Sequence, residues 1–276
     1  MRPPAGIADP DRQKHHCGHR GDDGAAAAPK SLSDTAESEG AISARHVAEY
    51  LFNLRLARRI EEKLKAEGFA ETRLLLTEGR AKPSLFRRVA AANNLPADLF
   101  LSIHHDAVPD SFLENWEFEG KKSHFSDRFS GYSVFVSRNN PDFETSLLFA
   151  ELIGREMKAQ GLQYARQYTQ AIMGRYQHPL LNEETGVYSY DKLIVLKSTG
   201  MPAVLLEAGS IINRDEEVLM SDPKHHALIG AAVTDAVDRF CATRGASAER
   251  APPGEVREAQ RKSPAVSPTF GTPAAK

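Results

Sequence analysis

The chain has 276 residues, which is enough for one large or two modest domains with a substantial core. Its formal net charge is −2 and it has no clustered run of lysine and arginine, so its composition does not favour binding to nucleic acid. Two cysteines are too few for a disulfide framework or a thiolate zinc finger, and no apolar run reaches the roughly 18 residues that would span a bilayer.

The two ends of the chain differ in composition from the rest. Residues 1–40 are rich in Ala, Gly, Asp and Ser and have no apolar periodicity, so we expect an irregular arm. This arm lacks the apolar segment of a secretory signal peptide, which indicates either a cytoplasmic protein or a chain without its export leader. Residues 244–276 are rich in proline and poor in large apolar groups, which predicts a disordered tail. The folded body is therefore expected over residues 41–243.

Helical and strand patterns alternate along this body. Apolar residues at helical spacing predict a helix from Val47 to Leu64, and a short β-like run follows at 72–77. Further helices are predicted at 84–94, 143–157 and 222–242, and further strands at 98–104, 131–137, 192–197 and 202–209. Strands that are apolar on both faces and alternate with amphipathic helices indicate a single α/β domain, with a mostly parallel sheet covered by helices on both faces.

Two connections are longer than a compact domain needs, residues 108–130 and 162–191. Long insertions of this kind are more often functional loops or lids than accidents. Their aromatic residues Trp116, Tyr188 and Tyr190 are candidates for lining a groove or covering a site.

His104 and Glu207 each close an apolar strand, at the edge where sheets of this class bind their ligands. Successive strand residues point to opposite faces, so His104 and His105 cannot serve the same centre in the same way. A carboxylate directly after an apolar run must be paired, ligated or placed in an opening. Each residue also has an ordinary alternative: a hydrogen-bonded core histidine for His104, and a turn cap or an arginine pair for Glu207.

Glu49 and His19 complete a candidate metal set. Glu49 begins the first amphipathic helix, where a carboxylate also compensates the helix dipole. His19 lies in the glycine-flanked segment CGHRGDDGA, where a histidine of a mobile arm is an equally simple interpretation. Two imidazoles and one carboxylate suit zinc with an open fourth position for water, and a further glutamate can act as general base. The four residues are too far apart in sequence for a local motif, so only the fold can bring them together.

Four segments, in order, resemble the zinc-dependent N-acetylmuramoyl-L-alanine amidases of the cell-wall amidase-3 family. EYLFNLRLARRIEEKLKAEGF is similar to the family's "Ekd.nL.iA..l...L...G", and FRRVAAANNLPADLF to "l.eRv..AN...adlf". ADLFLSIHHDA resembles "adlfiSIHaNA", and MPAVLLEAGSIINRDEEVLM resembles "PavLvEtGFisN.eEe..L". Any one segment is a weak signal, but the ordered set over residues 41–240 is specific.

This resemblance implies a six-stranded sheet with a single Zn²⁺ at the carboxyl ends of its strands. By position, Glu49 and His104 match metal ligands, and Glu207 matches the catalytic glutamate. The family's first histidine lies in "DpGHGG.D.GA" after an apolar strand, and the matching GHRGDDGA offers His19 without such a strand. His15 and His16 stay open as alternates, and a second GA at 40–41 is a rival match for the end of that motif.

Several further positions follow or depart from the family pattern near the site. Arg88 and Asn93 occupy matching positions and are candidate substrate-binding residues, although helix packing and a helix C-cap explain them equally well. The sequence HHDA stands where the family has HaNA, and Gly209-Ser210 stands where it has GF, which indicates a divergent subfamily with altered substrate contacts. We expect Asp106 either to face the substrate or to support the site from behind the metal ligands. His105 is expected to face away, where it packs or forms a hydrogen bond.

The implied activity is hydrolysis of the amide bond between N-acetylmuramic acid and L-alanine in peptidoglycan. Zinc would polarise the amide carbonyl, and Glu207 would pass the proton of the attacking water to the departing amine. The resemblance implies peptidoglycan and a protein activator as partners, and a periplasmic or extracellular location. Two other functions stay open at this point: a zinc amidohydrolase or peptidase with a small cytoplasmic substrate, and a cell-wall binding module without catalysis.

Overall fold

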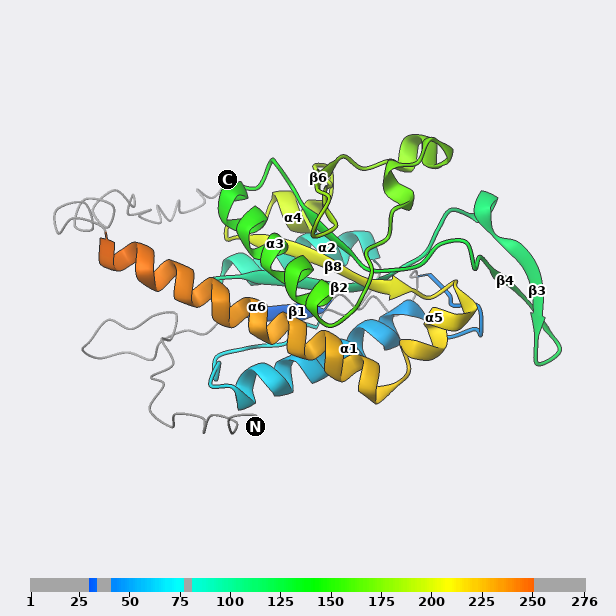
Figure 1. Ribbon diagram of the computed structural model, residues 1–276, viewed down its shortest axis with the longest axis horizontal. Helices are drawn as coiled ribbons and strands as arrows, with labels where there is room; N and C mark the ends of the chain where they lie inside the picture. The colour runs from blue at the N-terminus through cyan, green and yellow to red at the C-terminus, as the bar shows by residue number, and fades with distance from the viewer. Residues whose placement is uncertain (1–29, 34–40, 77–80, 251–276) are drawn as a thin grey trace, which may run out of the picture.

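The computed structural model describes residues 30–33, 41–76 and 81–250. Within these residues, six strands form one sheet in the order β1-β2-β8-β5-β7-β6 (Figure 1). The strands are Lys30–Ser33 (β1), Phe100–Asp106 (β2), Ser133–Val136 (β5), Leu180–Asn182 (β6), Val187–Ser189 (β7) and Ala203–Ser210 (β8). β1, β2 and β8 run parallel, as do β5 and β7, whereas β5 is antiparallel to β8 and β6 is antiparallel to β7.

Helices cover both faces of this sheet. On one face lie α1 (Glu49–Ala66), α3 (Phe143–Ala159) and α6 (Pro223–Arg250), and on the other lie α2 (Ala81–Asn93) and the short α4 (Ile194–Lys197). Side chains alternate along β2, so Leu101 and Ile103 pack with the first group and Phe100 with the second. None of the helices in the described residues is long and apolar enough to cross a membrane.

The first helix shows how the sequence determines its element. Phe52, Leu56, Ile60 and Leu64 recur every four residues, and all four are buried, so they form one apolar stripe against the sheet. The helix ends at Ala66, and Gly68 then adopts a left-handed backbone with φ of 98°, a conformation that favours glycine after a helix. The stripe places the first residue of the helix, Glu49, beside the carboxyl end of β2.

The predicted fold class, an α/β domain with a mostly parallel sheet and helices on both faces, is confirmed. Two predicted strands are wrong. Residues 72–76, the described part of the run at 72–77, are irregular, and residues 192–197 contain the helix α4. Apolar runs of this length fit a strand and a buried helical turn equally well, and here Val195 and Leu196 are buried as part of a helix.

The predicted boundaries of the folded body also need correction. Residues 30–33 lie within the arm that was expected to be irregular, but they form β1 and pair in parallel with β2 from Phe100 to Ile103. At the other end, α6 continues to Arg250, past residue 244, where the tail was expected to begin. The segment KSLS has no apolar pattern that would predict a strand. It joins the sheet because its backbone pairs with the neighbouring strand β2.

The two long connections carry structure of their own. Residues 108–130 contain a short 3-10 turn (Asp110–Phe112) and an antiparallel hairpin of β3 (Glu114–Phe118) and β4 (Lys121–Phe125), which projects from the body (Figure 1). Residues 162–191 contain the 3-10 segments η2 (Gln167–Thr169) and η3 (Ala171–Tyr176) before β6 and β7. A further helix, α5 (Arg214–Leu219), follows β8.

Candidate active site

His104 and Glu207 lie side by side at the carboxyl ends of β2 and β8. The two strands are parallel, and the pairing register sets His104 directly opposite Glu207. Both residues continue the face of the sheet that α2 and α4 cover, because they follow Phe100 and Leu205 by even numbers of residues. The fold therefore brings together two residues that are far apart in sequence.

Glu49 joins this pair from the first turn of α1. The Nδ1 atom of His104 donates to Glu49 Oε1 across 3.0 Å, and both side chains are largely buried. Burial alone would raise the pKa of Glu49, but the hydrogen bond and charge of His104 outweigh it and lower that pKa to about 2. Burial lowers the pKa of His104, whereas Glu49 and Glu207 raise it, with a net upward shift. The site thus favours a charged carboxylate at Glu49.

Glu207 occupies a different electrostatic environment. Burial raises its pKa well above the usual value, and the nearby carboxylates of Asp106 and Glu49 act in the same direction, against the effect of His104. The residue is partly exposed, yet its Oε2 atom is buried and has no hydrogen-bond partner among the described residues. A buried carboxyl oxygen without a partner is costly in a purely structural role, and it suits a group that handles a proton or faces a ligand.

The third predicted metal ligand, His19, lies outside the described residues, as do His15 and His16. No group of three His, Cys, Asp or Glu side chains that could hold a metal ion occurs in the part of the chain that the structure describes. A carboxylate and an imidazole in contact are nevertheless donors that zinc prefers, and the partnerless oxygen of Glu207 lies beside them. Two of the three predicted metal ligands, Glu49 and His104, therefore lie together in the described part of the site.

Asp106 is close to this centre, but the protein itself holds it. Its Oδ2 atom accepts hydrogen bonds from the hydroxyl of Tyr168 at 2.6 Å and from Gln167 Nε2 at 3.1 Å. Burial raises its pKa to about 7, against the lowering effect of the Tyr168 hydrogen bond. Sequence reasoning did not identify Tyr168 or Gln167, although both lie in the insertion 162–191 that was expected to be functional. Asp106 thus anchors that insertion at the end of β2.

Arg88 and Asn93, both on α2, have different locations. Arg88 is buried, and its positive charge lowers the pKa of His104, so it lies within electrostatic reach of the site. Burial lowers the pKa of Arg88 itself to about 10. A buried guanidinium at this position is consistent with the expected role near the substrate, but also with packing of α2.

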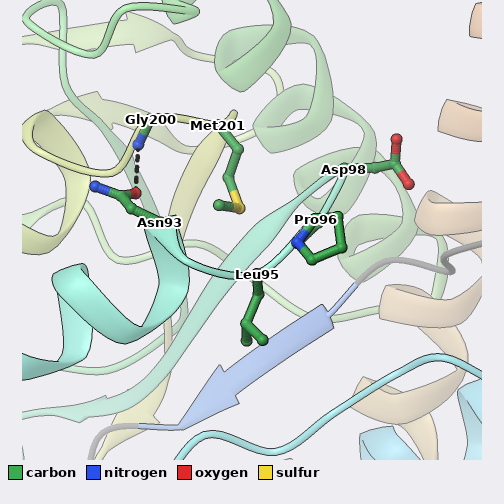
Figure 2. A pocket seen from close by; sticks show the side chains of 7 residues that line it. Asn93, Leu95, Pro96, Asp98, Gly200 and Met201 are labelled. Carbon is green, nitrogen blue, oxygen red and sulfur yellow. Dashed lines mark hydrogen bonds between the residues drawn. The ribbon is translucent and has the colours of Figure 1, made fainter. Parts of the chain in front are cut away.

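The structure does not bring Asn93 to the site. Its Oδ1 atom accepts a hydrogen bond from Gly200 N at 2.8 Å, and its Nδ2 donates to the carbonyl of Ser198. Asn93 lines a cleft of about 510 Å³ at the amino-terminal ends of β2 and β8. Figure 2 shows its side chain turned toward Gly200. His104 is four residues into β2, roughly 13 Å along the strand at 3.3 Å per residue. Asn93, the last residue of α2, therefore connects this helix to the loop before β8.

The three aromatic residues that were expected to line a groove differ in role. Tyr188 is completely buried in the core, and its hydroxyl donates to the carbonyl of Ala165, so the expectation is wrong for this residue. Tyr190 is partly buried and packs against the ring of His178. Trp116 lies on the projecting hairpin, with the guanidinium groups of Arg45 and Arg214 within 5.5 Å of its ring centre.

Comparison with known families matches residues 16–239 to the family described as N-acetylmuramoyl-L-alanine amidase (Amidase_3). The chain belongs to this family. The match covers well over half of the chain, including Glu49, His104 and Glu207. In this family context, the cluster at the ends of β2 and β8 is the candidate amidase site. A search of curated proteins finds no matching relative.

Solved structures of amidases share the fold. The amidase Ami1 from Mycobacterium smegmatis superposes with a TM-score of 0.58 at 16% identity, covering 78% of this chain and 97% of Ami1. The catalytic domain of CwlV from Paenibacillus polymyxa gives a TM-score of 0.54 at 24% identity, and the alignment covers 77% of this chain and 97% of that domain. CwlD from Clostridioides difficile, solved in a complex with the GerS lipoprotein, gives a TM-score of 0.55 at 18% identity. That alignment covers 78% of this chain and 99% of CwlD. At these identities the likeness establishes the fold alone.

Proposed function

We propose that this member of the amidase family hydrolyses the amide bond between N-acetylmuramic acid and L-alanine in peptidoglycan. The observation that carries the proposal is the convergence of Glu49, His104 and Glu207 from α1, β2 and β8 at one edge of the sheet. Ligands of open α/β sheets bind beyond the carboxyl ends of the strands, which is where these three side chains meet.

One zinc ion is part of the proposal. Glu49 and His104 would hold it, with His19 as the proposed third ligand from the part of the chain outside the described residues. When bound, zinc supplies Lewis acidity that polarises the amide carbonyl. The carboxylate form of Glu49, which its lowered pKa favours, is the form that a cation requires.

Glu207 would transfer the proton in this reaction. Its carboxylate accepts a proton from the attacking water as the water oxygen bonds to the carbonyl carbon. The resulting carboxylic acid returns the proton to the nitrogen as the carbon–nitrogen bond breaks. The products are the lactyl carboxylate of the muramic acid and a stem peptide with a free amino-terminal L-alanine. Burial raises the pKa of Glu207, which supports a group that holds a proton between the two steps.

A substrate in the cell wall implies action in the periplasm or outside the cell. A protein activator is also part of the proposal, because the solved structure of the family member CwlD contains the GerS lipoprotein. The hairpin of β3 and β4, which projects from the body, would offer such an activator an exposed surface (Figure 1).

Purified sacculi provide the test. The wild-type protein is expected to release stem peptides with free amino-terminal L-alanine, and the Glu207→Gln variant at least 100-fold fewer, because a positioned acid–base group contributes about 10² to 10⁴ to the rate. Glu62→Gln, a change on the exposed face of α1, is the matched control and should retain the wild-type rate.

The same samples separate the alternative functions. A wild-type protein that holds stoichiometric zinc but releases no stem peptide would favour a hydrolase with a small substrate. A protein that binds sacculi without holding zinc would favour a binding module. Equal release by the wild type and Glu207→Gln would contradict the proposed role of Glu207.

A further inference from the structure

The second histidine of the HHDA segment belongs to a buried chain of hydrogen bonds that ends on Glu49. His105 points to the face of the sheet that α1 covers, opposite to His104, and is only 1% exposed. Its Nδ1 atom lies 2.7 Å from Asn53 Oδ1. Asn53 is also buried, and its Nδ2 atom donates to Glu49 Oε1 at 3.0 Å. The chain therefore runs from His105 through Asn53 to Glu49.

Chemistry determines the direction of every hydrogen bond in this chain. A carboxylate only accepts hydrogen bonds, so Asn53 must present its amide nitrogen to Glu49. The amide oxygen then faces His105, which must carry its proton on Nδ1 to donate to it. His105 thereby selects the orientation of the Asn53 amide, and Asn53 supplies a donor to the carboxylate.

The helix makes this arrangement possible. Glu49 and Asn53 are four residues apart in α1 and therefore lie on the same face, one turn above the other. The Oε1 atom of Glu49 accepts from Asn53 on its own helix and from His104 on β2. The ring of His105 is held in turn by packing against Phe52, with 5.7 Å between ring centres.

We propose that Asn53 and His105 are positioning residues that hold the Glu49 carboxylate in the orientation in which it binds the metal ion. This inference rests on the proposed function, in which Glu49 is a zinc ligand. A carboxylate fixed by a buried donor loses less conformational entropy when it binds a cation, and residues that orient metal ligands typically change metal affinity 10- to 100-fold. The doubled histidine then has two roles on opposite faces of β2, both directed at Glu49.

Zinc affinity measured by competition with a chromophoric chelator tests this inference. His105→Phe keeps a ring against Phe52 but removes the donor, and Asn53→Ala removes the amide from a helix that tolerates alanine well. Both variants are expected to bind zinc 10- to 100-fold more weakly than the wild type. His105→Asn, whose amide nitrogen can take the place of Nδ1, is expected to recover most of the affinity.

His226→Phe is the matched control. His226 is a buried histidine whose Nε2 atom bonds to the carbonyl of Met220, and it makes no hydrogen bond to Asn53 or Glu49. This variant should bind zinc within about twofold of the wild type even if its melting temperature falls. Melting curves in chelator show that each variant is folded, and the visible spectrum of the Co²⁺-loaded protein reports the geometry of the metal site, which a purely structural role would not change.

The outcomes distinguish this inference from the proposed function. A wild-type protein without measurable zinc affinity overturns the zinc site and the inference together. A wild-type protein that binds zinc, with equal affinity and an unchanged Co²⁺ spectrum in folded His105→Phe and Asn53→Ala, overturns the inference alone. If His105→Phe does not fold, the zinc affinity of Asn53→Ala alone tests the inference.

Discussion

At the scale of single residues, Asp106 shows how a site residue can also anchor a distant segment. Its Oδ2 atom accepts hydrogen bonds from Tyr168 and Gln167 of η2. We expect Tyr168→Phe to lower the free energy of unfolding by about 1–3 kcal/mol, because it leaves a buried carboxyl oxygen with one donor fewer. Urea denaturation of the metal-free protein measures this difference.

Asp106→Asn is the informative companion to that change. An asparagine keeps an oxygen that can accept from both Tyr168 and Gln167, so its loss of stability should be smaller than that of Tyr168→Phe. A Tyr168→Phe variant as stable as the wild type would show that the hydroxyl contributes nothing to holding η2.

At the scale of elements, the contact between α3 and the β6–β7 turn depends on a glycine. A Cβ atom on Gly154 of α3 would overlap the carbonyl oxygen of Thr185. Gly154→Ala should therefore lower the free energy of unfolding by about 1–3 kcal/mol through overpacking, despite the higher helix propensity of alanine. Thermal and urea denaturation measure the change.

Gly230→Ala is the control for helix propensity alone. Gly230 lies in α6, where an added Cβ would meet only the side chain of Lys63, at an ordinary contact distance of 3.7 Å. This variant is expected to be more stable than the wild type by up to about 1 kcal/mol. Equal effects at the two glycines would contradict the packing argument for Gly154.

At the scale of the whole molecule, a metal ion at the site would link α1 to the central strands, because Glu49 lies on α1 and His104 on β2. A ligand that binds only the native state stabilises it, by about 4 kcal/mol when its free concentration is a thousand times Kd. We therefore expect EDTA to lower the melting temperature of the wild-type protein, and added zinc to restore it, in a calorimetric or fluorescence measurement.

Glu49→Gln separates this linkage from a general effect of EDTA. The amide is a poor metal ligand, so the melting temperature of this variant should respond much less to EDTA and zinc. A wild-type melting temperature that is the same with EDTA and with zinc would count against a metal that stabilises the fold.

The sequence alone determined the α/β class, the apolar strands β2, β5 and β8, and the main helices. It also placed His104 and Glu207 at strand ends and predicted that His105 faces away from them. These inferences succeeded because apolar periodicity reports locally which face of an element is buried.

The antiparallel direction of β5, the helical form of 194–197 and the edge strand β1 follow from contacts in the folded molecule and could not be predicted from the sequence. The folded molecule also shows that Asp106 meets Tyr168, that Asn93 lies at the opposite edge from His104, and that Asn53 connects His105 to Glu49. Side chains alternate between the two faces of a strand whichever way the strand runs, so this pattern does not reveal the direction of β5. A short apolar run fits a strand and a helical turn equally well. A side chain's partners depend on which elements pack together, and that information lies in the fold as a whole.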